Sequence, residues 1–132
     1  RMGISSLVVD TNAYVAFCKA KKSTVNHMRS AEKLYLPLIV IAELRADFLA
    51  GTKKVENEHN LEQFLDSERV EIIEPNLDTT YVYARLFNQL KKQGTPIPMN
   101  DLWIASLTLQ NNSYLLSSDK HFDYIGQLLR IS

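Results

Sequence analysis

Hydrophobic residues recur along this chain in two patterns, as short apolar runs and as longer stretches with helical spacing. The short runs predict strands at residues 7–9, 34–36, 70–73, 114–116 and 129–131. The helical spacing predicts helices at residues 13–21, 24–33, 38–50, 57–66, 78–93 and 102–110. Strands and helices that alternate in this way favour an α/β fold, in which a parallel sheet of about five strands is covered by helices on both faces.

Length and charge narrow the possibilities further. The chain has 132 residues, which suits one compact domain, 1–132. Hydrophobic residues make up 45% of it, as in an ordinary globular protein. Because 15 lysines and arginines balance 15 acidic residues, no overall basic field attracts a nucleic acid. A polyanion must therefore be held locally, by a few basic side chains or by metal ions.

The short apolar runs and the single cysteine indicate a cytoplasmic protein without a membrane segment. The longest apolar run, residues 38–42, is far shorter than the roughly 18 residues that a membrane span needs. No charged and then apolar leader is visible at the start of the sequence. The single cysteine, Cys18, excludes an internal disulfide framework and suits a reducing compartment.

Asp10 stands where the first predicted strand ends. In parallel α/β sheets, ligands bind at the carboxyl ends of strands, near the point where the strand order reverses. Asp10 could instead simply cap the helix that follows. Thr11 and Asn12 are good capping residues closer to that helix, so we expect Asp10 to have a functional role.

Glu43 lies in the predicted helix 38–50, whose first turn is apolar on every side and should be buried. An unpaired buried charge costs free energy. Glu43 therefore has either a functional role or a buried ion pair with a lysine or arginine.

Two polar residues, Asn100 and Asp101, precede the largely apolar helix 102–110. Asn100 is a natural N-cap, and the helix dipole favours an acid at Asp101 by roughly 0.3–1 kcal/mol. Capping needs only one polar residue here, so Asp101 is a further candidate functional acid.

Asp119 follows the predicted strand 114–116 and is either a fourth functional acid or the cap of a short helix. Asp123, one helical turn later, could share or replace its role. His121 lies close enough to Asp119 in the sequence to contact substrate.

Carboxylates that converge at one edge of a sheet repel one another. At 4 Å, each pair costs ~1 kcal/mol in water and ~4 kcal/mol at an effective dielectric constant of 20. Mg²⁺ or Mn²⁺, which prefer oxygen ligands, would remove that cost. Such a site can hydrolyse phosphodiesters, because the metal neutralises the phosphate and activates water. The predicted metal-binding and catalytic residues are Asp10, Glu43, Asp101 and Asp119.

Four motifs span nearly the whole chain: VVDTN, IAEL, GTPIPMNDLWIAS and LLSSDKHFD. In this order and spacing they resemble the PIN-domain ribonucleases, and among them the VapC-type toxins of toxin–antitoxin pairs. The NDLWIA block is the most specific of the matches.

The resemblance implies a three-layer α/β/α fold and Mg²⁺- or Mn²⁺-dependent cleavage of RNA. It also implies a homodimer and inhibition by a small cognate antitoxin. Asp10, Glu43 and Asp101 match the family's core metal-binding acids, and Asp119 matches the fourth. Asn12 matches the polar residue that steadies the first acid, and Ser117 stands where a threonine is usual. Leu38 and Met99 depart from the hydroxyl residues common at their positions.

Two alternatives to a ribonuclease stay open at this point. A non-catalytic PIN-like binding module would keep the fold, although such a module would be expected to have lost at least one of the acids. A receiver-like phosphate-handling domain has a similar length and a strand-end aspartate. It requires a phospho-acceptor aspartate after the third strand, where this chain has Glu74 and Pro75.

Overall fold

Five parallel strands form one sheet in the computed structural model, which describes residues 4–132. The strands are β1 (Ser6–Val9), β2 (Lys33–Pro37), β3 (Val70–Ile73), β4 (Tyr114–Leu116) and β5 (Arg130–Ile131). Their order across the sheet is β3-β2-β1-β4-β5. The predicted α/β fold with about five parallel strands is therefore confirmed.

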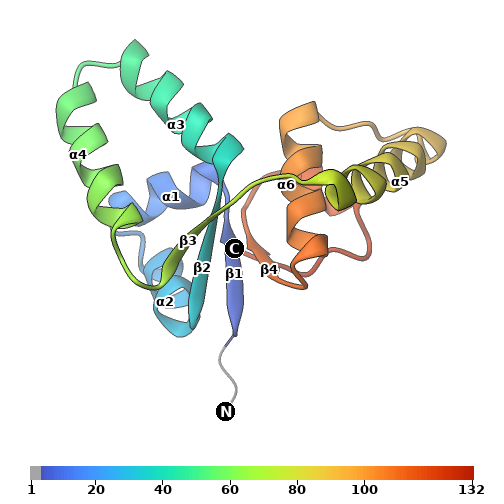
Figure 1. Ribbon diagram of the computed structural model, residues 1–132, viewed down its shortest axis with the longest axis horizontal. Coiled ribbons are helices and arrows are strands. Elements are labelled where there is room, and N and C mark those ends of the chain that lie inside the picture. The colour runs from blue at the N-terminus through green and yellow to red at the C-terminus, as the bar shows by residue number, and fades with distance from the viewer. Residues whose placement is uncertain (1–3) are drawn as a thin grey trace.

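Helices connect the strands and form the other two layers. They are α1 (Thr11–Cys18), α2 (Lys22–Ser30), α3 (Leu38–Ala50), α4 (Lys54–Leu65), α5 (Leu77–Gln93), α6 (Met99–Gln110) and the 3₁₀ helix η1 (Lys120–Tyr124). Figure 1 shows α1 to α4 on one side of the sheet and α5 and α6 on the other. No helix in the described part of the chain is both long and apolar enough to span a membrane.

The two helical layers follow from the order of the strands. The chain moves outward from β1 through β2 to β3, and it then returns across the sheet to β4 on the other side of β1. Because such crossovers are right-handed, the outward and return connections lie on opposite faces. The strand order therefore reverses between β1 and β4, whose carboxyl ends are the expected position of a ligand.

The strand order also contradicts the receiver-like alternative. In receiver-type sheets the first strand lies between the second and the third. Here β3 is an edge strand, separated from β1 by β2. Glu74 thus follows a strand that is not adjacent to the one that ends at Asp10.

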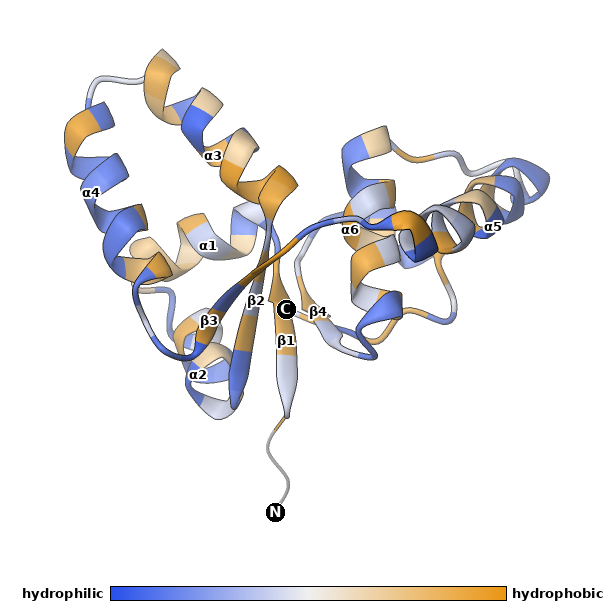
Figure 2. Cartoon of the chain, viewed as in Figure 1, coloured by the Kyte–Doolittle hydropathy of each residue, from blue (hydrophilic) through white to orange (hydrophobic). Residues whose placement is uncertain are grey.

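The core surrounds β1, whose residues Leu7, Val8 and Val9 are fully buried. A central parallel strand is covered on both faces, which explains its continuous hydrophobic run. Figure 2 shows that α3 is hydrophobic where it begins next to the sheet, whereas α4 is largely hydrophilic. The prediction that the first turn of α3 is buried on every side is wrong for Leu38, whose exposed fraction is 46%.

Candidate active site

The carboxylate of Asp10 lies at the reversal point of the sheet. Val9 pairs in register with Leu116, so the next residues, Asp10 and Ser117, also lie side by side. The Ser117 hydroxyl donates a hydrogen bond to Asp10 Oδ2 over 2.6 Å, and the Thr11 backbone N–H donates to Oδ1 over 2.7 Å. Asp10 is only 4% exposed, so adjacent strands hold this acid in a fixed, buried position.

Asp10 is itself the N-cap of α1, so the prediction that Thr11 and Asn12 make it unnecessary for capping is wrong. The helix begins at Thr11, directly after the strand, and leaves no residue between the two elements. Asn12 is exposed. Among the hydrogen bonds of residues 4–132, those to the Asp10 carboxylate come from Thr11 and Ser117.

Glu43 lies in the second turn of α3 and connects two other segments of the site. Its Oε1 accepts a hydrogen bond from the Thr11 hydroxyl over 2.7 Å, and its Oε2 accepts one from the Asn100 amide over 3.1 Å. Within residues 4–132, no lysine or arginine forms an ion pair with it. The alternative of a buried ion pair is therefore wrong.

Asp101 lies in the first turn of α6, as predicted. The prediction that Asn100 caps this helix is wrong, because α6 begins at Met99 and its N-cap is Pro98. Asn100 is therefore inside the helix, where its side chain is free to donate to Glu43. Asp101 Oδ2 lies 2.8 Å from Nδ1 of His121.

Asp119 has the capping role that was predicted for it as one of two alternatives. It is the N-cap of η1, and its Oδ1 accepts a hydrogen bond from the His121 backbone N–H over 2.9 Å. The same oxygen lies 3.2 Å from His121 Nδ1. The ligand atoms of Asp101, Asp119 and His121 all lie within 4.8 Å of one another, so the structure brings two of the four predicted acids together with an imidazole.

Asp123 lies apart from this group. It forms an ion pair with Arg130, and its side chain is 51% exposed. Arg130 Nη1 also donates to the backbone carbonyls of Asp119, over 2.9 Å, and Ser117, over 3.3 Å. Sequence reasoning missed this arginine, although a lone basic residue in the apolar terminal stretch LLRIS was a usable signal.

The acids influence one another electrostatically. Burial, assisted by the charges of Asp101 and Glu43, raises the pKa of Asp10 to about 6, although hydrogen bonds from Ser117 and Thr11 lower it. Burial also raises the pKa of Asp101. The hydrogen bond and charge of His121 lower this pKa, whereas the charges of Asp119 and Glu43 raise it. Carboxylates that disfavour one another's ionised form are a donor set that fits a divalent cation.

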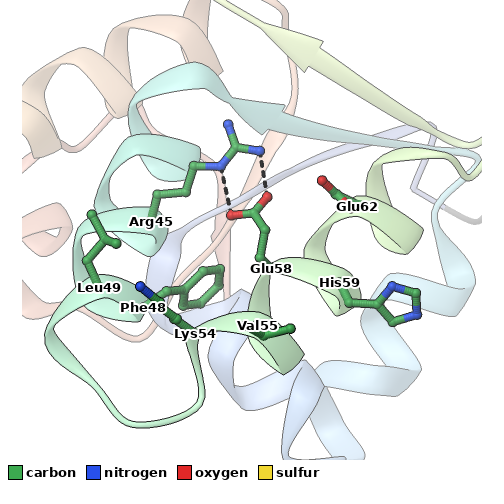
Figure 3. A pocket seen from close by; sticks show the side chains of 8 residues that line it. All are labelled: Arg45, Phe48, Leu49, Lys54, Val55, Glu58, His59 and Glu62. Carbon is green, nitrogen blue, oxygen red and sulfur yellow. Dashed lines mark hydrogen bonds and ion pairs between the residues drawn. The ribbon is translucent and has the colours of Figure 1, made fainter.

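A separate cavity of about 560 Å³ lies between α3 and α4 (Figure 3). Arg45 donates two hydrogen bonds to the Glu58 carboxylate across it. The other lining residues are Phe48, Leu49, Lys54, Val55, His59 and Glu62. None of the four candidate acids lines this cavity. The candidate active site therefore lies elsewhere, at the carboxyl ends of β1 and β4.

Comparison with protein families matches the PIN domain to residues 7–128. Ribonuclease VapC1 of Haemophilus influenzae (strain R2866) is 32% identical over 126 residues, which cover 92% of each chain. Ribonuclease VapC2 of Rickettsia felis is 33% identical over 127 residues, which cover 92% of this chain and 93% of the relative.

Solved structures have the same fold. The crystal structure of VapBC2 from Rickettsia felis, bound to a DNA fragment from its promoter, matches with a TM-score of 0.83 and 30% identity over 96% of this chain and 97% of that chain. The structure of VapBC-1 from nontypeable Haemophilus influenzae matches with a TM-score of 0.82 and 28% identity, over the same shares of the two chains.

Proposed function

Because this chain belongs to the PIN domain family, we propose that it is a metal-dependent endoribonuclease and the toxin of a toxin–antitoxin pair. The observation that carries this proposal is the position of Asp10 at the reversal point of the sheet, within the electrostatic reach of Asp101 and Glu43. The names of the relatives, Ribonuclease VapC1 and Ribonuclease VapC2, support RNA as the substrate.

Asp10, Glu43, Asp101 and Asp119 would hold Mg²⁺ or Mn²⁺. When bound, such a cation supplies charge neutralisation at the scissile phosphate and an activated water molecule. The chain's own residues orient the acids. Ser117 and the Thr11 backbone fix the two oxygens of Asp10, and the Thr11 hydroxyl and Asn100 fix those of Glu43.

The proposed partners follow from the same family membership. The solved relatives from Rickettsia felis and Haemophilus influenzae are VapBC assemblies, which supports a cognate antitoxin for this chain. We further propose a homodimer, a single domain over residues 1–132, and action in the cytoplasm. The one cysteine, Cys18, is unpaired and exposed, as suits a reducing compartment.

The test is cleavage of structured RNAs by the purified protein in Mg²⁺, in Mn²⁺ and with EDTA. We expect cuts in the presence of a metal, and we expect EDTA to abolish them because the ligands are carboxylate oxygens. The Asp101→Asn variant, which keeps the shape of the side chain and removes its charge, should give no cuts in either metal. Asp78→Asn, in the first turn of α5, is the matched control and should cleave like the wild type.

A folded wild-type protein that cleaves none of several RNAs in either metal would contradict the proposed activity. Calorimetric titration with both metals then distinguishes two explanations. Binding that depends on Asp101 would indicate a metal site with a narrow RNA target. Absence of binding would favour the non-catalytic binding module.

Arg130 is expected to set the affinity for the metal without being a ligand. Its guanidinium holds the carbonyls of Ser117 and Asp119, so it fixes the segment that carries one acid and supports another. Replacing Arg130 with methionine should weaken Mn²⁺ binding by about 10–100-fold in calorimetry, as loss of outer-shell partners does at other metal sites.

Asp123→Asn is the control for this variant, because it removes only the ion pair with Arg130. A pair with an exposed partner contributes about 0–1 kcal/mol to stability, so the metal affinity of Asp123→Asn should stay close to that of the wild type. Equal effects of the two variants would show that the carbonyl contacts of Arg130 are unimportant.

A further inference from the structure

The imidazole of His121 faces two of the candidate acids. Its Nδ1 lies 2.8 Å from Asp101 Oδ2 and 3.2 Å from Asp119 Oδ1. The imidazole is 45% exposed, whereas the side chains of Asp101 and Asp119 are 15% and 27% exposed. The ring therefore forms the outer wall of the acidic site, and solvent or a ligand can reach it.

These separations suit a shared ion. Around a small octahedral cation with ligand distances of about 2.1 Å, two neighbouring ligand atoms lie about 3.0 Å apart. The two distances from His121 Nδ1 lie on either side of that value. Since the ligand atoms of all three residues lie within 4.8 Å of one another, one cation could contact the imidazole and both carboxylates.

The backbone already holds this group in place. Asp119 Oδ1 accepts a hydrogen bond from the His121 backbone N–H. The residues that carry the carboxylate and the imidazole are therefore held together at the start of η1. The Asp119 backbone is fixed in turn, because its N–H donates to the Ser117 hydroxyl over 3.1 Å and its carbonyl accepts from Arg130 over 2.9 Å. These contacts fix the turn of η1 that carries both side chains.

We propose that His121 is a metal ligand through Nδ1, together with Asp101 and Asp119, and that it makes this position prefer Mn²⁺ over Mg²⁺. The inference rests on the proposed function, which supplies the cation. Mg²⁺ demands oxygen ligands and retains its waters, whereas first-row transition metals accept imidazole nitrogen more readily. A mixed oxygen and nitrogen set therefore discriminates against Mg²⁺ in a way that four carboxylates do not.

The test is electron spin-echo envelope modulation of the full chain loaded with one equivalent of Mn²⁺, which detects a directly bound ¹⁴N nucleus. We expect nitrogen modulation in the wild type and its loss in His121→Gln. The control is His59→Gln, which changes a residue that lines the cavity between α3 and α4 and should keep the modulation. By calorimetry, His121→Gln should weaken Mn²⁺ binding by about tenfold and leave Mg²⁺ binding close to the wild-type value.

The wild-type spectrum is informative by itself, so the test does not depend on how well a variant folds. Mn²⁺ that binds without nitrogen modulation would overturn the role of His121 as a ligand, while metal-dependent RNA cleavage would leave the nuclease intact. Equal losses of Mn²⁺ and Mg²⁺ affinity in His121→Gln would overturn the metal preference. Failure of the wild type to bind either metal would overturn both this inference and the proposed function.

Discussion

Replacing Asp10 with asparagine is expected to abolish RNA cleavage and, at the same time, to stabilise the metal-free protein. The loss of activity should be about 10³-fold or more, because the charge that holds the cation contributes several kcal/mol to transition-state stabilisation. Asparagine can still accept the Thr11 N–H and can donate to the Ser117 hydroxyl, so the contacts of the site are preserved. Single-turnover cleavage and thermal unfolding measure the two effects.

The gain in stability follows from the pKa of Asp10, which burial raises from 3.8 to about 6. The folded state binds the proton more tightly than the unfolded state does. The contribution of Asp10 to the free energy of unfolding is therefore present below about pH 4 and is lost as the pH rises to about 6. Asparagine does not ionise, so the free energy of unfolding of the variant does not fall in this way. The metal-free variant should therefore be more stable than the wild type at pH 7 by about 1–3 kcal/mol.

Saturating Mn²⁺ should reverse the order of stability. A ligand that binds only the folded state stabilises it by about 4.1 kcal/mol at one thousand times its dissociation constant, which exceeds the gain of the variant, and only the wild type retains the full set of acids. A metal-free Asp10→Asn protein that unfolds at a lower temperature than the wild type would contradict the effect assigned to burial. Cleavage at the wild-type rate would contradict the assignment of Asp10 as a ligand.

Glu43→Gln is expected to lower the rate of RNA cleavage by about 10²-fold, which is typical for loss of one preorganised charged or polar group. Glutamine has a single acceptor oxygen, whereas Glu43 accepts from both the Thr11 hydroxyl and the Asn100 amide. Because the glutamine amide can accept from Asn100 and donate to the Thr11 hydroxyl, the variant mainly removes the charge that faces the other acids. The variant should also bind Mn²⁺ more weakly in calorimetry.

Asp47→Asn is the matched control, since Asp47 lies one turn further along α3 and is exposed. It should bind Mn²⁺ and cleave RNA like the wild type. If both variants lost activity equally, the effect would come from the charge of α3 as a whole. A fully active Glu43→Gln would exclude Glu43 from the metal site.

The positions of three of the four candidate acids were predictable, because each of the three is close to the end of a strand or the start of a helix. Asp10 and Asp119 follow the predicted strands 7–9 and 114–116, and Asp101 falls within the first turn of α6. The contacts among them were not predictable to the same degree. The prediction for α6 started three residues too late, and that error made Asn100 a cap when its side chain instead contacts Glu43.

The sequence by itself determined the α/β class and the approximate positions of the strands and helices, because hydrophobic periodicity indicates which residues of each element face the core, and the assignment of the four acids to a metal site stays a prediction. Only the tertiary structure decided which polar groups meet, since those contacts join distant segments, as Ser117 joins Asp10 across 107 positions. They depend on strand register and on the exact residue at which a helix begins. A shift of one residue redirects a side chain. The hydrogen bonds of Thr11 and Asn100 to Glu43, the contact of His121 with Asp101, and the hydrogen bonds of Arg130 to the carbonyls of Ser117 and Asp119 therefore appear only in the folded chain.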